Sequence, residues 1–309
     1  MKTYLLPCRN DYNSFWQPIC SMYGGNILDR TNTLSFGNFN YKTLTAIPQM
    51  RTLNYTFKEL SDMRGEILGS LAENNNCKIN LMWSGGIDST VAAVSFMKSE
   101  LARKHLVILL NKTSIGEYPL FFNDYIKNKV NYEIVDSPKN FLKYEDINVT
   151  GEIGDQLFGS AMFTTAFRAE KLFLKPETFF SKEFLDVMQP QIVYSPYELK
   201  EVKDYLWWMN FSLKYQNVQL RIYPSVFMPY GGITHFFDTE DFQLWAMNNP
   251  DNKIKDTMSS YKWPAKDYIF EYTKDSLYRD NKLKVGSLRI GPIKCAIDEN
   301  FKYEVCYVN

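Results

Sequence analysis

The chain has few of the side chains from which metal centres and histidine-based catalytic sites are built. It contains two histidines, His105 and His235, and five cysteines that form no Cys-x-x-Cys pair. A disulfide framework, a zinc site and an iron–sulfur site are therefore not expected. A lone histidine is more often structural than catalytic, so histidine-based catalysis is not expected either.

An excess of one charge and a long apolar run are also lacking. Lys plus Arg and Asp plus Glu number 35 each, so no overall field would gather nucleic acid or hold the chain on an anionic membrane. No apolar run approaches the roughly 20 residues of a membrane span, and the first ten residues do not form a signal peptide. We expect a cytoplasmic protein with no membrane partner and with nucleic acid disfavoured. Its 45% apolar residues are enough for a large core.

The most informative stretch runs from Lys78 to Lys98. A short apolar run is followed by Ser-Gly-Gly-Ile-Asp-Ser and then by a small-residue amphipathic segment. This order predicts a strand, a tight turn and a helix whose N-terminus lies at the turn. Glycines let a phosphate approach the backbone amides, and hydroxyls donate further hydrogen bonds to it. The residues assigned to nucleotide binding here are Ser84, Gly85, Gly86, Asp88, Ser89 and Thr90.

Asp88 does not fit a simple phosphate cradle, because a carboxylate repels a phosphate. A magnesium ion between the two would remove that conflict. The alternative is that Asp88 or Ser89 only caps a helix after a glycine turn.

The Ser-Gly-Gly-Ile-Asp-Ser loop after a strand resembles the pyrophosphate loop of the N-type ATP pyrophosphatases. This superfamily includes asparagine synthetase, GMP synthetase, NAD synthetase and several tRNA-modifying enzymes, which cleave ATP between its α and β phosphates. The resemblance implies ATP and Mg²⁺ as cofactors. It also implies a Rossmann-like nucleotide-binding core of the adenine nucleotide α-hydrolase type.

Apolar strands alternate with helical segments after this loop. Strands are expected at 105–110, 132–135 and 147–150, with a helix at about 121–129. Such alternation is typical of a parallel sheet with crossover helices. We therefore predict an α/β fold whose parallel-sheet core spans residues 78–165.

The rest of the chain differs in composition from this core. Aromatic residues and turn formers predict a small irregular or β region at 1–65, although a helix is expected from Phe57. Given the resemblance of the glycine loop, we expect residues 66–309 to form one ATP pyrophosphatase domain of the synthetase-like kind. It consists of the core, a helical part at 166–290 whose clearest helix starts at Tyr197, and a terminal hairpin at 291–309.

A second glycine-bounded turn follows the strand at 147–150 and opens a helix. Turns after strands of an open parallel sheet lie along the same carboxyl edge, so the two turns are expected to face one cleft. Each contributes one carboxylate, Asp88 and Asp155. Together they suit magnesium, which takes its remaining ligands from phosphates and water. The alternative for this turn is an ordinary loop with a capping aspartate.

The second turn, Thr-Gly-Glu-Ile-Gly-Asp-Gln-Leu-Phe-Gly, resembles an element of the asparagine synthetases and the related β-lactam and carbapenam synthetases, Ser-Gly-Glu-Gly-Ala-Asp-Glu-Leu-Phe-Gly-Gly. Gln156 replaces a glutamate of that element, and Ser160 replaces its second glycine. The resemblance implies that Glu152 orients or deprotonates the attacking amine. Gly151, which opens the turn, is placed with the nucleotide-binding residues.

Two later stretches also resemble the synthetases. Leu-Tyr-Arg-Asp-Asn-Lys-Leu-Lys-Val-Gly resembles their basic element, which carries the catalytic lysine onto Lys284, with Lys282 as the close alternative. Without the resemblance it is a solvated basic stretch. His-Phe-Phe-Asp resembles Pro-Phe-Leu-Asp, where Asp238 is as consistent with a helix cap as with a site residue. Adenine is expected near Leu81 and Leu110.

These resemblances imply an ATP-dependent carbon–nitrogen ligase. It would adenylate a small-molecule carboxylate, release pyrophosphate and form an amide with ammonia or another amine. Lys2 stands where glutaminase-bearing members have a catalytic cysteine, so we expect no built-in glutaminase and free ammonia, a separate glutaminase partner or a substrate amine instead. Two alternatives remain. One is adenylation of a nucleobase carbonyl, disfavoured by the neutral charge. The other is a weakened nucleotide-binding protein, suggested by Gln156 and the short connection at 136–146.

Overall fold

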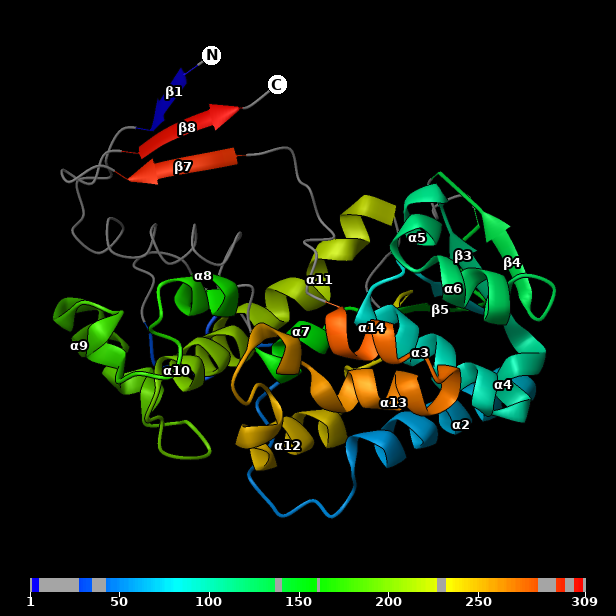
Figure 1. The fold of residues 1–309 in the computed structure, drawn as a ribbon, viewed down its shortest axis with the longest axis horizontal. Coiled ribbons are helices and arrows are strands. Elements are labelled where there is room, and N and C mark those ends of the chain that lie inside the picture. The colour runs from blue at the N-terminus through cyan, green and yellow to red at the C-terminus, as the bar shows by residue number, and fades with distance from the viewer. Residues whose placement is uncertain are drawn as a thin grey trace.

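The computed structural model describes residues 2–5, 28–34, 43–136, 141–159, 162–226, 232–282, 293–297 and 303–307. Within these residues the strands form a five-stranded parallel sheet and a three-stranded antiparallel sheet, and helices make up much of the remainder (Figure 1). The predicted α/β class and parallel sheet are confirmed.

The parallel sheet has the strand order β4-β3-β2-β5-β6. The chain enters this sheet at its central strand, β2, and continues outward through β3 to β4. It then returns to the other side of β2, where β5 and β6 follow. The direction of winding therefore reverses between β2 and β5. The strands are β2 Ile79–Met82, β3 Leu106–Leu110, β4 Asn131–Ile134, β5 Ile147–Thr150 and β6 Thr234–His235.

The helices before β6 precede β2, connect β2 to β3 and β3 to β4, or lie between β5 and β6. They are α2 Phe57–Asn75, α3 Ile87–Lys98, α4 Glu100–His105, α5 Lys112–Glu117, α6 Pro119–Phe121, α7 Gly154–Phe158, α8 Met162–Arg168, α9 Lys182–Ile192, α10 Val202–Met209 and α11 Tyr215–Val226, with π-helical turns at Phe122–Ile126 and Asn210–Lys214. After β6 come α12 Glu240–Asn248, α13 Trp263–Thr273 and α14 Ser276–Asn281.

One face of the parallel sheet is covered by helices. Leu81, Ile108 and Val149 point into the main core and are fully buried. α2 packs against α3 and α4, and α13 lies along α3 (Figure 1). The close approach of α2 depends on glycine, since a Cβ at Gly65 would lie 2.4 Å from Ser95 Oγ and one at Gly69 would lie 2.5 Å from the Ala102 backbone nitrogen.

The opposite face carries a smaller apolar cluster and a polar contact. Side chains alternate between the faces of a strand, so Leu109 points away from the main core and joins Leu142 and Ile233. On the same side Asn80 Nδ2 donates to Asn148 Oδ1 at 3.0 Å. This side-chain bond joins the two central strands and satisfies two buried amides.

Helix starts follow local capping. Thr56 and Glu59 form a capping box that starts α2, as the sequence predicts for Phe57 onward. The boundary expected between residues 65 and 66 falls inside this helix. The helix expected from Tyr197 instead begins at Val202, because the Asp204 carboxylate accepts the backbone N–H of Glu201 and ends the preceding extended segment.

The antiparallel sheet joins strands from both ends of the chain. Its order is β1-β8-β7, with β1 Lys2–Leu5, β7 Ile293–Ile297 and β8 Tyr303–Tyr307. β8 pairs with β7 on one side and with β1 on the other. The first and last strands therefore lie side by side (Figure 1).

None of the helices in the described ranges is long and apolar enough to span a bilayer.

Candidate functional site

The two glycine turns of the sequence follow β2 and β5, which are neighbours in the parallel sheet. Met82 at the end of β2 is in register with Thr150 at the end of β5. The winding of the sheet reverses between these two strands, and ligands of open α/β sheets bind at such a switch point, outside the carboxyl ends of the strands. Neighbouring strands in register explain why turns so far apart in sequence meet.

The first turn is held in shape by its own hydroxyl groups. Ser89 Oγ accepts from the Ser84 backbone N–H at 3.1 Å and donates to the Gly86 carbonyl at 3.2 Å. Ser84 Oγ lies 3.0 Å from Ser89 Oγ and accepts from the Gly86 N–H at 3.3 Å. Gly85 has φ +78°, a conformation that favours glycine. Hydrogen bonds between the turn's own residues therefore fix its shape.

This turn leads into the first turn of α3. Gly86 is the N-cap of α3, and as a glycine it has no side chain that could cap the first helical N–H groups. Such groups, together with the helix dipole, attract an anion. Thr90 differs from the expectation, because it is fully buried and its hydroxyl accepts from Trp83 Nε1 at 3.1 Å. We therefore leave Thr90 out of the phosphate contacts that we propose.

The second turn packs directly on the first. A Cβ at Gly151 would lie 2.6 Å from the Ser89 backbone nitrogen, and one at Gly154 would lie 2.4 Å from Asp88 Cγ. Between the two glycines, Ile153 adopts φ +76°, although it is β-branched and buried. Strained backbone of this kind is held by its surroundings and is frequent at functional sites.

A lysine that the sequence analysis did not identify joins the two aspartates. Lys262 Nζ lies 2.7 Å and 2.5 Å from Asp88 Oδ1 and Oδ2, and 2.7 Å from Asp155 Oδ1. The Lys262 side chain is 3% exposed, while those of Asp88 and Asp155 are 22% and 35% exposed. The ammonium is therefore the buried member of the cluster, and the two aspartate side chains are partly exposed.

The charges in this cluster control the pKa values of the buried groups beside it. Burial opposes the charge on Lys262, but the carboxylates of Asp155 and Asp88 outweigh burial and raise its pKa above the usual 10.5. Burial, followed by the same two carboxylates, raises the pKa of Tyr261. Lys262 is therefore an ammonium at neutral pH, and Tyr261 is a neutral phenol.

Lys282 lies beside the first turn through an ion pair. Its Nζ is 2.9 Å from Glu117 Oε1, and a Cβ at Gly85 would lie 2.8 Å from Glu117 Cβ. α14 is held near the loop because Tyr278 stacks on Tyr118 with ring centroids 3.8 Å apart. The structure thus places one of the two candidate catalytic lysines next to the glycine loop.

Other candidate residues occupy different surroundings. The backbone N–H of Glu152 donates to Thr150 Oγ1 at 3.2 Å. Leu81 and Leu110 belong to the main core, so their side chains are not available to adenine. Asp238 accepts from Tyr215 Oη and Gln219 Nε2 at 2.7 and 2.6 Å, while Thr239 caps α12. Lys284 and Ser160 lie outside the described residues.

Gln156 contacts the helical part of the chain through its side chain. Its side chain is 2% exposed, and Nε2 donates to Asn210 Oδ1 at 3.3 Å. Asn210 Nδ2 in turn donates to the carbonyl of Asp155 at 2.9 Å. The Gln156 amide is thus part of a buried contact.

His235 has a structural role. Its Nε2 donates to the Gln219 carbonyl at 2.7 Å, which leaves Nδ1 to accept from Thr150 Oγ1 at 2.6 Å. This contact fixes the end of β5, from which the second turn begins.

In the part of the chain that the structure describes, no group of three or more His, Cys, Asp or Glu residues could hold a metal ion. The candidate for magnesium is therefore a pair of carboxylates, the number that magnesium commonly takes from a protein when phosphates supply further oxygens.

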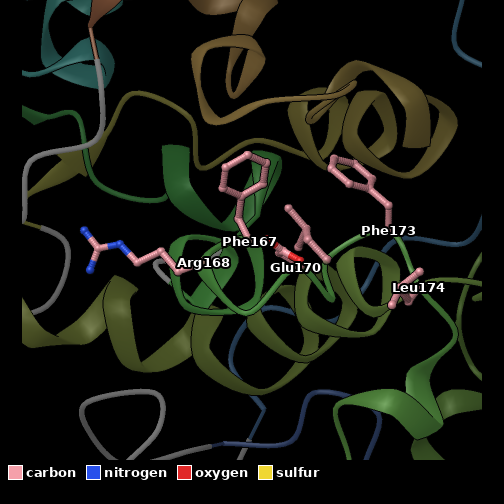
Figure 2. Close-up of a pocket in the computed structure, with 6 residues that line it drawn as sticks. Phe167, Arg168, Glu170, Phe173 and Leu174 are labelled. Carbon is pink, nitrogen blue, oxygen red and sulfur yellow. The ribbon is translucent and has the colours of Figure 1, made fainter.

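A pocket of about 490 Å³, lined by none of the residues of these turns, lies at the end of α8. Figure 2 shows residues that line it. Phe167 and Phe173 line it together with Leu172 and Leu174, and its charged residues are Arg168 and Glu170. Phe163, one turn earlier on α8, contacts Tyr261 with ring centroids 5.6 Å apart. α8 therefore connects this pocket with the residue next to Lys262.

No protein-family model matches the chain, and no curated protein matches it.

Proposed function

We propose that the protein is an ATP-dependent carbon–nitrogen ligase similar to the asparagine synthetases. It adenylates a carboxylate with release of pyrophosphate and then transfers the acyl group from AMP to ammonia or another amine, which releases AMP. The observation that carries the proposal is the meeting of two turns at the switch point of a parallel sheet, where Asp88 and Asp155 contact the same ammonium. This arrangement supports the resemblance of both turns to the synthetase loops.

The residues of the site suit magnesium and a nucleotide. Carboxylate oxygens are the hard ligands that magnesium prefers, and Asp88 and Asp155 remain partly exposed although the ammonium below them is buried. The first turn of α3, whose N-cap Gly86 offers no capping side chain, directly follows the glycine loop and favours phosphate. Gly154 allows the second turn to approach Asp88 closely.

Each group of residues has a task in the proposed reaction. Magnesium would supply charge neutralisation and polarisation of the phosphates. The N–H groups at the start of α3 bind the phosphate oxygens, and Ser84 and Ser89 fix the shape of the loop. Preorganised positive groups stabilise the charge that grows on the leaving pyrophosphate, a role we assign to Lys284 or Lys282. Glu152 orients or deprotonates the amine.

The first test is pyrophosphate release from Mg-ATP with a panel of amino acids and other small carboxylates, with ammonium as the amine. We expect release that depends on one carboxylate and falls by at least about 10²-fold in Asp88→Asn. The matched control is Glu271→Gln, which removes a surface carboxylate paired with Lys58. The control should release pyrophosphate at the wild-type rate.

Two outcomes would contradict the proposal. Carboxylate-independent release that requires RNA would favour adenylation of a nucleobase carbonyl. The second outcome is ATP binding that Asp88→Asn abolishes, together with no pyrophosphate release for any carboxylate. That result would favour a nucleotide-binding protein without catalysis.

A further inference from the structure

The backbone conformation of Lys262 and its place at the start of α13 fix the position of its side chain. Lys262 is the N-cap of α13 with φ +60°, and its N–H donates to the Lys253 carbonyl at 3.1 Å. Pro264 follows in the first turn of α13 and fixes the start of the helix. The ammonium lies 5.7 Å from the ring centroid of Tyr261 and 6.0 Å from that of Phe158. The side chain is therefore packed and directed at the aspartates.

The position is unusual for a cation. The N-terminus of a helix carries partial positive charge, which opposes a lysine there. Burial opposes the charge further. What compensates is the pair of carboxylates, because Nζ contacts both oxygens of Asp88 and one oxygen of Asp155. The two aspartates in turn would repel each other without a cation between them.

We infer that Lys262 is the resident counter-cation of the Asp88–Asp155 pair and that a divalent metal ion competes with it for the same carboxylate oxygens. The inference rests on the proposed function only in taking these two aspartates as the magnesium ligands. Both Asp88 oxygens already accept from the ammonium, so a metal that ligates Asp88 must share or take an oxygen from Lys262. Free metal therefore binds weakly, and the phosphates of a nucleotide are needed to bring it in.

The test uses Mn²⁺ as a magnesium probe and requires no catalysis. Binding of Mn²⁺ to the nucleotide-free protein is measured by electron paramagnetic resonance for wild type, Lys262→Met and Lys262→Gln. We expect at least tenfold tighter binding in both variants, because the competing positive charge is gone. The double variant Lys262→Met with Asp88→Asn should lose this gain in Mn²⁺ affinity.

The matched control is Lys253→Met. Lys253 is also a buried lysine, but its ammonium donates to the carbonyls of Ala246 and Asn249 rather than to the aspartates. This variant should bind Mn²⁺ as weakly as wild type does. Thermal unfolding gives a second readout. Lys262→Met should melt lower than wild type in EDTA and recover with Mg²⁺, whereas Lys253→Met should show no such recovery.

Mn²⁺ binding in Lys262→Met and Lys262→Gln that equals or falls below that of wild type would overturn the inference, as would a gain that persists with Asp88→Asn. The outcome is separable from that of the proposed function. If no carboxylate supports pyrophosphate release but the Lys262 variants bind Mn²⁺ more tightly, the ligase proposal fails. The inference that Lys262 is the counter-cation is then still supported. If release requires Asp88 but the variants gain nothing, the counter-cation alone is wrong.

Discussion

Lys282 and Glu117 form an ion pair at 2.9 Å whose side chains are only 12% and 16% exposed. The pair joins the end of α14 to the residue that packs on Gly85, so it connects a basic segment from late in the sequence to the glycine loop. Lys282 therefore has a partner that explains its position without a substrate. We therefore propose Lys284 for the catalytic role that the synthetase resemblance implies.

This relationship predicts different results for the two lysines. Lys282→Ala should lower the free energy of unfolding by about 3 kcal/mol, because Glu117 would be left in a poorly solvated site without its cation. Lys284→Ala should keep wild-type stability but lower the rate of pyrophosphate release by about 10²–10³-fold. Urea unfolding and single-turnover release distinguish them. The reverse pattern would identify Lys282 as the catalytic residue.

A second prediction concerns the contact between the two turns. Gly154→Ala should move Asp88, because the added Cβ would lie 2.4 Å from Asp88 Cγ. Overpacking of this kind costs about 2 kcal/mol and should weaken the ion pair with Lys262. We expect lower stability in urea and weaker binding of Mg-ATP by calorimetry.

The control for this change is Gly116→Ala in α5, where a Cβ would meet nothing within 4 Å. That variant should equal wild type or gain up to about 1 kcal/mol, since alanine is the better helix former. If Gly154→Ala and Gly116→Ala had the same stability in urea and the same affinity for Mg-ATP, the two turns would not be in contact as described.

A third prediction concerns the pH dependence of stability. Burial lowers the pKa of Lys266 to about 8, more than the Asp280 carboxylate restores, and its ammonium donates to the Ser259 carbonyl. Between pH 8 and the unfolded value of 10.5 the unfolded chain holds a proton that the folded chain has lost. Stability should therefore rise with pH through this window, by at most about 3 kcal/mol.

Lys266→Met isolates this contribution from the other groups that titrate at alkaline pH. The difference in unfolding free energy between wild type and the variant, measured in urea from pH 7.5 to 10.5, should shift in favour of wild type as pH rises. A difference that is constant with pH would show that Lys266 is not perturbed.

Local sequence predicted the parts of the site that are themselves local. The order of apolar run, glycines and small-residue helix determines β2, the first turn and α3, and the same signal recurs at β5 and α7. Their meeting also followed from the sequence, because parallel strands share a carboxyl edge. The start of the helix at Val202 was missed, since the stripe of apolar residues extends past the cap that Glu201 and Asp204 form.

Lys262 could not be found from such local patterns. It is 174 residues from Asp88 in sequence, and its role comes from tertiary packing of α13 against α3. One weak signal was present. Lys262 precedes Trp-Pro at a helix start, and proline in a first turn marks that start while a lysine before it is opposed by the helix dipole. A cation placed there indicates a compensating negative partner.

The last prediction concerns Gln156, where the synthetases that the second turn resembles carry a glutamate. Judged by the resemblance alone, Gln156→Glu would restore the charge that this turn lacks. The structure instead predicts an unfavourable contact, because the Gln156 amide donates to Asn210 Oδ1 in a buried contact, and Asn210 cannot reverse its own amide while Nδ2 donates to the Asp155 carbonyl. A glutamate would place oxygen against oxygen.

We therefore expect Gln156→Glu to lower the free energy of unfolding by about 2 kcal/mol and not to increase pyrophosphate release. Gln156→Met is the matched variant, since it keeps the length of the side chain and loses only the hydrogen bond, so it should cost less than the glutamate. Urea unfolding near pH 7 ranks the three proteins. A glutamate variant that is as stable as wild type and more active would mean that residue 156 faces the aspartates, and that the glutamine does reduce the charge of the site.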